Sequence, residues 1–230
     1  MIKYIMCGRF GLWANPKQVS DHFQLQEPLP FTPRYNIAPS QEVLAVGQTR
    51  EGQRKAAWLR WGLVPHWAKD EKVGYKMINA RAETIFTKPA YKAAAKRHRC
   101  LIPASCFFEW QRTEGKKKQP YCIRPKNEGL FAFAGLWEHW QDEEADRKID
   151  SCTIVTTRAN EAVAELHDRM PVIIGKADFD LWLDRSLEDP ERLQPLLEPV
   201  SSQELELYPV GLEVNSPAND SKEVIKERKI

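Results

Sequence analysis

The sequence predicts an α+β fold with a largely antiparallel β-sheet. The chain has 230 residues, of which 42% are hydrophobic, and this composition is typical of a globular domain that buries a sizeable core. Strand-like runs occur in pairs around hairpin signals, which favours antiparallel pairing. The helical segments are short and do not alternate regularly with strands, so a parallel α/β sheet is not expected.

The first half of the chain begins with a helix and continues with a hairpin. Asn15 followed by Pro16 predicts a helix start, because Asn caps an N-terminus and proline fits the first turn. Strands are expected at 42–46 and 55–61, on either side of a turn at 49–53.

The second half mixes strands with short helices in the same way. A helix is expected from about 83 to 98, interrupted by Pro89. The remaining expected elements are strands at 107–112, 120–124, 130–140, 153–157 and 171–174, and helices at 160–166, 179–183 and 191–197. Three charged segments are expected to be solvated: a hairpin tip at 114–118, a loop at 142–150 and a tail at 221–230.

Composition excludes several classes of protein. The formal net charge is +2, so nucleic-acid binding would need a local basic patch. No apolar run approaches the length of a membrane span, and a cytoplasmic protein without a membrane partner is expected. The five cysteines include no CxxC pair, so neither a disulfide framework, a metal site nor a cofactor is expected.

Common catalytic motifs such as GxSxG, HExxH and GxGxxG are absent, and polar residues instead lie within aromatic or proline-flanked segments. In chain order these segments are Met6-Cys-Gly-Arg-Phe10, Arg34-Tyr-Asn-Ile-Ala-Pro39, Trp61-Gly-Leu-Val-Pro-His-Trp67, Ile78-Asn-Ala-Arg-Ala-Glu-Thr84, Cys106-Phe-Phe-Glu-Trp110, Leu166-His-Asp-Arg-Met-Pro171 and Val214-Asn-Ser-Pro-Ala-Asn-Asp220.

This ordered set resembles the SRAP family, the SOS response-associated peptidases that process abasic sites. The resemblance extends from Cys7 to about Asp220. It implies a single domain with a curved, barrel-like sheet, short flanking helices and a basic DNA groove. It also implies a role in the DNA damage response, in which a thiazolidine links the N-terminal cysteine to a ring-opened abasic site in single-stranded DNA. Lyase and autopeptidase activities are further implied.

The chemistry of an N-terminal cysteine agrees with this implication. An abasic deoxyribose opens to an aldehyde, and a free α-amine, with a reference pKa of about 7.7–8.0, is partly neutral at cellular pH and forms an imine with it. Only an N-terminal cysteine holds a thiol two carbons from that amine, so thiol attack closes a five-membered ring with a high effective molarity.

Residues 1–6 depart from the family pattern, because Cys7 carries an amide nitrogen while they are attached. Either translation starts at Met6, which is then removed, or the protein cleaves its own leader; the first explanation is favoured. The expected organisation is therefore a leader at 1–6, an SRAP domain at 7–220 and a charged tail at 221–230. Cys7 as a buried core thiol is the alternative.

Three further residues are carried over from the resemblance as catalytic. Asn79 positions the cysteine or the sugar, unless it only caps a helix. Glu109 stands between Phe108 and Trp110, where apolar neighbours would raise its pKa and suit it to proton transfer. His167 could protonate the sugar ring oxygen, although an isolated histidine is more often structural.

DNA contacts are expected from two groups of residues. Arginines adjacent in sequence to the catalytic residues would converge into a phosphate site, and they are Arg9, Arg81 and Arg169. Other positions match family residues near DNA, and they are Asn36, Trp67, Trp110 and Thr156. Trp67 could stack on a base, with core packing as its alternative.

Two other functions remain open at this stage. A cysteine peptidase acting in trans would use Cys7 as nucleophile and His167 as base. A non-covalent reader of modified DNA bases would bind reversibly. The position of the cysteine directly after a methionine favours the crosslinking function, with single-stranded DNA as partner and a monomeric protein.

Overall fold

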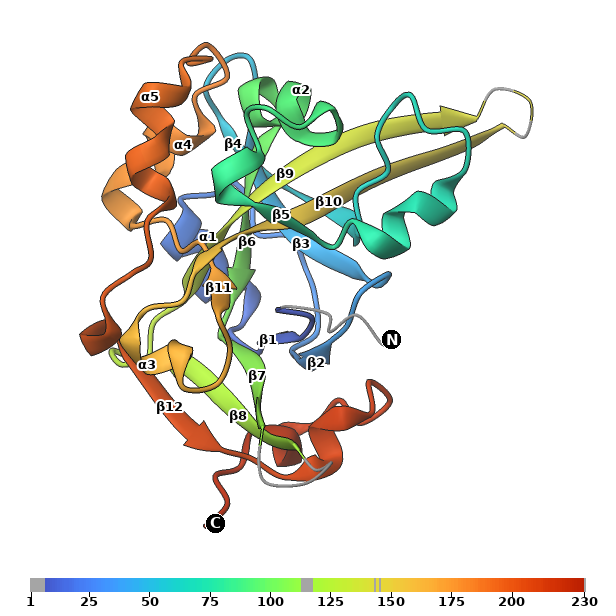
Figure 1. Ribbon diagram of the computed structural model, residues 1–230. Helices are drawn as coiled ribbons and strands as arrows, with labels where there is room; N and C mark the ends of the chain where they lie inside the picture. The colour runs from blue at the N-terminus through green and yellow to red at the C-terminus, as the bar shows by residue number, and fades with distance from the viewer. Residues whose placement is uncertain (1–6, 113–117, 143, 145, 230) are drawn as a thin grey trace.

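The computed structural model describes residues 7–112, 118–142, 144 and 146–229. It confirms the α+β fold, with two β-sheets and short helices around them (Figure 1). The strands are β1 (Phe10–Leu12), β2 (Arg34–Ile37), β3 (Glu42–Gln48), β4 (Arg54–Trp61), β5 (Asn79–Arg81), β6 (Arg99–Ala104), β7 (Cys106–Arg112), β8 (Lys118–Pro125), β9 (Phe131–Asp142), β10 (Arg147–Arg158), β11 (Arg169–Pro171) and β12 (Leu205–Pro209). The α-helices are α1 (Pro16–Phe23), α2 (Pro89–Arg97), α3 (Glu161–Ala164), α4 (Phe179–Leu183) and α5 (Pro190–Leu193).

The larger sheet closes into a five-stranded barrel. Its strands follow the order β10-β4-β3-β6-β9, and β9 pairs back to β10. All of these pairings are antiparallel except the parallel pair of β10 with β4. Because the sheet is closed, these strands have no free edge over their paired length, and the closed pairing keeps the sheet strongly curved.

The second sheet is antiparallel, with strand order β12-β8-β7-β1-β2. Aromatic side chains join it to the barrel. Phe10 of β1 lies edge-on to Trp61 of β4, with 5.2 Å between ring centroids, and to Phe133 of β9, at 5.9 Å. Phe107 of β7 also contacts Phe133. Each such side chain buries a large apolar area, so these contacts fix β1 and β7 against the barrel.

Several elements match the positions expected from the sequence. Helix α1 starts at Pro16, and Asn15 forms a reciprocal capping box with Gln18. The hairpin of β3 and β4 is present, and so are β7 and β8, which flank the expected tip at 114–118. Most of that tip lies outside the described residues.

Other expectations were wrong in extent. The helix expected from 83 is a single 3-10 turn, η2 (Ala82–Thr84), and α2 begins only at Pro89, because proline lacks the N–H that an earlier helix would need there. The charged loop expected at 142–150 is mostly strand. Strands β9 and β10 extend as a long hairpin, and Arg147 pairs with Asp142 next to its turn.

The segment expected to be a charged tail packs against the second sheet. Val224 lies on the 3-10 turn η7 (Lys222–Ile225) and is fully buried with Val210 and Val214 beside Phe108. The charged residues around it mask this apolar position in the sequence. Among the described residues, no helix is long and apolar enough to cross a membrane.

Candidate active site

Cys7 lies just before β1, within reach of groups from two distant parts of the chain. Its backbone nitrogen donates to Oε1 of Glu109 at 2.9 Å, and its Sγ lies 3.8 Å from the carbonyl oxygen of Arg169. Its φ of 41° places the backbone in the left-handed region, and its side chain is buried. Both the backbone nitrogen and the sulfur of Cys7 are therefore held by specific partners.

Glu109 is positioned by the second sheet. It lies on β7 opposite Tyr121 of β8, and β7 is paired on its other side with β1, which begins at Phe10, shortly after Cys7. Only 3% of the residue is exposed. This burial raises the pKa of the Glu109 carboxyl to about 7, and the hydrogen bonds from Cys7 oppose part of the rise. The carboxyl can therefore both accept and donate a proton near neutral pH.

The Cys7 thiol is held in its neutral form. Burial raises its pKa well above the ordinary value, and the neighbouring Glu109 carboxylate adds to the rise. A neutral thiol is a poor nucleophile toward a peptide carbonyl. The site therefore does not provide an activated thiolate at Cys7.

His167 follows α3, and its ring is held by the two residues that come after it. Its Nδ1 accepts a hydrogen bond from the backbone N–H of Arg169 at 3.1 Å and lies 2.9 Å from Oδ1 of Asp168. Burial lowers the pKa of the His167 imidazole, although Asp168 acts in the opposite direction. Burial thus favours the neutral ring, and Nδ1 faces both a backbone N–H donor and a carboxylate acceptor.

Strand β10 brings the arginines together. It pairs with β5 in parallel, so that Arg81 lies opposite Thr156, and with β11 in antiparallel, so that Arg169 lies opposite Arg158. Asn79 begins β5, and the Tyr91 hydroxyl donates to its carbonyl. The predicted convergence of these segments on one region is therefore present in the fold.

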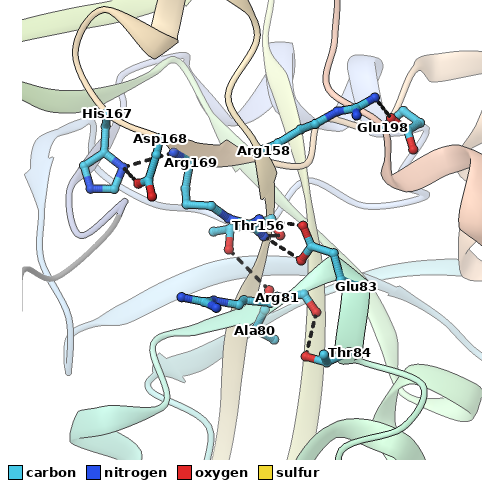
Figure 2. Close-up of polar contacts among 10 residues, drawn as sticks. All are labelled: Ala80, Arg81, Glu83, Thr84, Thr156, Arg158, His167, Asp168, Arg169 and Glu198. Atoms are coloured by element: carbon cyan, nitrogen blue, oxygen red, sulfur yellow. Dashed lines mark hydrogen bonds and ion pairs between the residues drawn. The ribbon is translucent and has the colours of Figure 1, made fainter.

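The two arginines of this region have different surroundings (Figure 2). Arg169 donates from Nη1 and Nη2 to the two oxygens of Glu83, at 2.5 and 2.9 Å, and from Nη2 to the carbonyl of Thr156. Arg81 is exposed, and its side chain extends away from Glu83. Glu83 was missed as a site residue, although it stands in the same sequence segment as Asn79 and Arg81.

Asn36 of β2 is fully buried and anchors the C-terminal segment. Its Nδ2 donates to the carbonyls of Val214, Ser216 and Asn219, and its backbone N–H donates to Oδ1 of Asp220. The side chain thus holds the end of the chain against the second sheet. Direct contact of Asn36 with DNA stays a prediction.

Arg9 and Trp110 are part of the same assembly. Nη1 of Arg9 donates to Oδ1 of Asn36 and to the carbonyl of Val214, and its guanidinium lies 5.9 Å from the ring centroid of Trp110. Nε1 of Trp110 donates to Oδ1 of Asn215 at 2.7 Å. Both side chains are partly exposed, so they combine structural contacts with surface that DNA could reach.

Thr156 and Trp67 occupy opposite extremes of exposure. Thr156 is fully buried, with Oγ1 near the carbonyl of Ala80, and its DNA contact stays a prediction. Trp67 is 57% exposed, on the connection between β4 and β5, so core packing does not explain it. The connection is pinned where Gly62, at φ 133°, meets Gly74 so closely that a side chain at either position would collide with backbone.

The structure thus gathers Cys7, Glu109, His167 and Arg169 directly, and places Asn79 and Arg81 on β5, which pairs with β10 as β11 does. No hydrogen bond in the described chain links Trp67 to this group. Within the same described residues, no cluster of three or more His, Cys, Asp and Glu side chains suitable for a metal ion occurs.

Comparison with known proteins places this arrangement in a family. The chain is 45% identical over 224 residues to the abasic site processing protein YoqW of Bacillus subtilis, covering 96% of this chain and 99% of the relative. It is 32% identical over 190 residues to the abasic site processing protein HMCES of Gallus gallus, covering 73% of this chain and 56% of that protein.

Solved structures share the fold. A crystal structure of a protein from Bacteroides thetaiotaomicron superposes with a TM-score of 0.87 at 24% identity, covering 97% of this chain and all of the other. A phage-related protein from Bordetella bronchiseptica gives a TM-score of 0.70 at 28% identity, over 89% and 94% of the two chains. The sequence profile described as SOS response associated peptidase (SRAP) matches residues 6–217, and the chain belongs to this family.

Proposed function

We propose that this protein processes abasic sites in single-stranded DNA by forming a covalent thiazolidine crosslink through Cys7. The names of its relatives support abasic-site processing as the activity. The observation that carries the proposal is the contact between the nitrogen of Cys7 and the Glu109 carboxyl, whose pKa is about 7. It pairs the atom that must attack an aldehyde with a group that can transfer protons at cellular pH.

The reaction requires a chain that begins at Cys7, because only a free amine can form the imine. Either translation starts at Met6 and an aminopeptidase removes that methionine, or the protein itself removes residues 1–6. The amine then adds to the aldehyde carbon of the open sugar, and water leaves to give an imine. The thiol sulfur adds to the imine carbon, its proton passes to the nitrogen, and the ring closes. The net change is loss of one water molecule.

Glu109 serves this sequence as the proton carrier. In its carboxylate form it accepts a proton from the attacking nitrogen, and in its protonated form it donates to the hydroxyl that leaves as water. A pKa of about 7 keeps both forms populated. Because burial disfavours charge, it also favours the neutral, nucleophilic form of an amine at the position of the Cys7 nitrogen.

His167 is the proposed donor for opening the sugar ring. Its Nδ1 is engaged by the Arg169 backbone N–H and the Asp168 carboxylate, so Nε2 is the nitrogen left to act on a substrate, and it donates when it carries the proton. The ring is 20% exposed, so a substrate can approach it.

Arg81 is the proposed phosphate contact, because its guanidinium is exposed beside the site. The exposed Trp67 is proposed to stack on a base. Arg9 and Trp110 are proposed to contact the strand farther along the second sheet. This arrangement would concentrate positive charge locally in a chain with a net charge of only +2.

The test compares proteins that begin at Cys7 on a single-stranded oligonucleotide with one abasic site. We expect the parent to form a heat-stable adduct whose intact mass equals protein plus DNA minus one water. Cys7→Ala should lose this adduct, and Cys152→Ala, which removes a buried barrel thiol, should keep it. Equal heat-stable adduct from Cys7→Ala would rule out the thiazolidine.

A further inference from the structure

The Glu83–Arg169 pair is built differently from an ordinary surface ion pair. Both carboxylate oxygens of Glu83 accept from both terminal nitrogens of Arg169 (Figure 2). The Arg169 side chain is only 11% exposed, whereas Glu83 is 51% exposed. The hydrogen bonds from Arg169 lower the pKa of the Glu83 carboxyl, so it stays ionised at neutral pH.

Glu83 is the charge partner that compensates a largely buried cation. Nε of Arg169 is buried and has no hydrogen-bond partner among the described residues, and Nη2 also donates to the carbonyl of Thr156. Without Glu83, Arg169 would keep that single backbone acceptor. A buried charge that loses its partner is strongly unfavourable, so the guanidinium would have to move toward solvent.

Movement of Arg169 would displace both the Cys7 thiol and the His167 ring, because the backbone of Arg169 contacts them. Its carbonyl oxygen accepts from the Cys7 thiol, and its N–H donates to Nδ1 of His167. Residue 169 also begins β11, where it pairs with Arg158. The side chain and the backbone of one residue thus connect Glu83 to the nucleophile and to the proposed ring-opening donor.

We infer that Glu83 is a positioning residue of the crosslinking site, acting through Arg169 to hold the Cys7 thiol and the His167 ring in place. This inference rests on the proposed function. Glu83 touches neither reactive group in the structure, and it is the η2 turn directly after β5 that carries it over Arg169. The inference also separates the two arginines: Arg81 faces the DNA phosphates, whereas Arg169 is occupied by Glu83 and holds the site together.

The chain offers a matched control on the neighbouring strand, where Arg158 of β10 pairs with Arg169 of β11. Glu198 pairs with Arg158 at 2.8 Å, but both side chains are well exposed, at 59% and 73%, and this pair does not contact a reactive group. Exposed pairs of this kind contribute little to stability. Glu198→Gln therefore controls for the loss of one carboxylate near the site.

The experiment uses proteins that begin at Cys7: parent, Glu83→Gln, Glu83→Asp and Glu198→Gln. Crosslinking is followed in single turnover at saturating abasic DNA, and affinity is measured separately with a tetrahydrofuran analogue that has no aldehyde. We expect Glu83→Gln to slow the saturated rate by about ten- to a hundredfold, as misplaced reacting groups do. Its affinity for the analogue should stay within about twofold of the parent, because Glu83 does not face the phosphates. Glu83→Asp, which keeps the charge, should recover part of the rate, and Glu198→Gln should match the parent.

A second measurement is independent of crosslinking. Nitrogen NMR of His167 should show the same balance of tautomers in the parent and in Glu198→Gln, and a different balance in Glu83→Gln, because the Arg169 N–H would no longer be held against Nδ1. A parent-like rate and tautomer in Glu83→Gln would overturn the inference. So would tighter, more salt-sensitive DNA binding by that variant, because Glu83 would then be occupying a phosphate position. If the parent itself does not crosslink, the proposed function fails, and the tautomer measurement still decides the role of Glu83.

Discussion

Replacing Glu109 with Gln should remove a loss of stability that the parent protein undergoes as the pH rises. The ordinary pKa of the carboxyl is 4.5, and burial raises it to about 7 in the folded protein. At about 1.4 kcal/mol per pKa unit, this difference corresponds to about 3 kcal/mol. Because the folded-state pKa is the higher one, folding favours the protonated form. The contribution is therefore complete below about pH 4.5 and is lost as the pH rises through about 7.

Glutamine keeps an oxygen that accepts from the nitrogen of Cys7 but cannot ionise. The free energy of unfolding of the variant, relative to the parent, should therefore rise by about 3 kcal/mol between pH 4.5 and pH 8.5. Urea denaturation of both proteins at several pH values measures this difference. Glu42→Gln, at an exposed position on β3, is the control for removing a carboxylate. A difference between parent and Glu109→Gln that stays constant across the range would refute the reasoning.

Two further variants test the proposed roles in the reaction. Arg81→Gln should weaken binding to single-stranded DNA and reduce the slope of log affinity against log salt concentration by about one, as loss of one phosphate contact does; an unchanged salt series would place the DNA groove elsewhere. His167→Ala should slow crosslinking by about a hundredfold to ten-thousandfold, and an already opened aldehyde substrate should restore its rate more than that of Glu109→Gln. Rescue of Glu109→Gln alone would reverse the two roles.

The fold was predictable where the local signals were strong. Asn15 and Pro16 start α1 because capping and proline geometry act within one turn. The short strands β1, β2 and β5 have too few residues for a pattern, and pairing with distant strands defines them. Val224 also could not be predicted from local signals. Its charged neighbours suggested a solvated tail, whereas tertiary packing buries it.

The candidate site was predictable as a set of residues but not as a geometry. The sequence suggested a raised pKa for Glu109 from its apolar neighbours, and burial on β7 produces it. The sequence did not indicate that the Asn36 side chain faces the C-terminal carbonyls, nor that Glu83 engages Arg169. Both depend on which segments meet across the sheets, and the spacing of residues along the chain does not encode this.

The wide sequence separation of the site's partners has a consequence during protein synthesis. Cys7 is among the first residues made, but its contacts with Glu109 and Arg169 span 102 and 162 residues, and the Arg9 contact with Val214 spans 205. At about 5–20 residues per second, translation needs roughly ten to forty seconds to cover that last interval. On the ribosome, the contacts that hold Cys7 and Arg9 in place are therefore completed only after nearly all of the chain has been made.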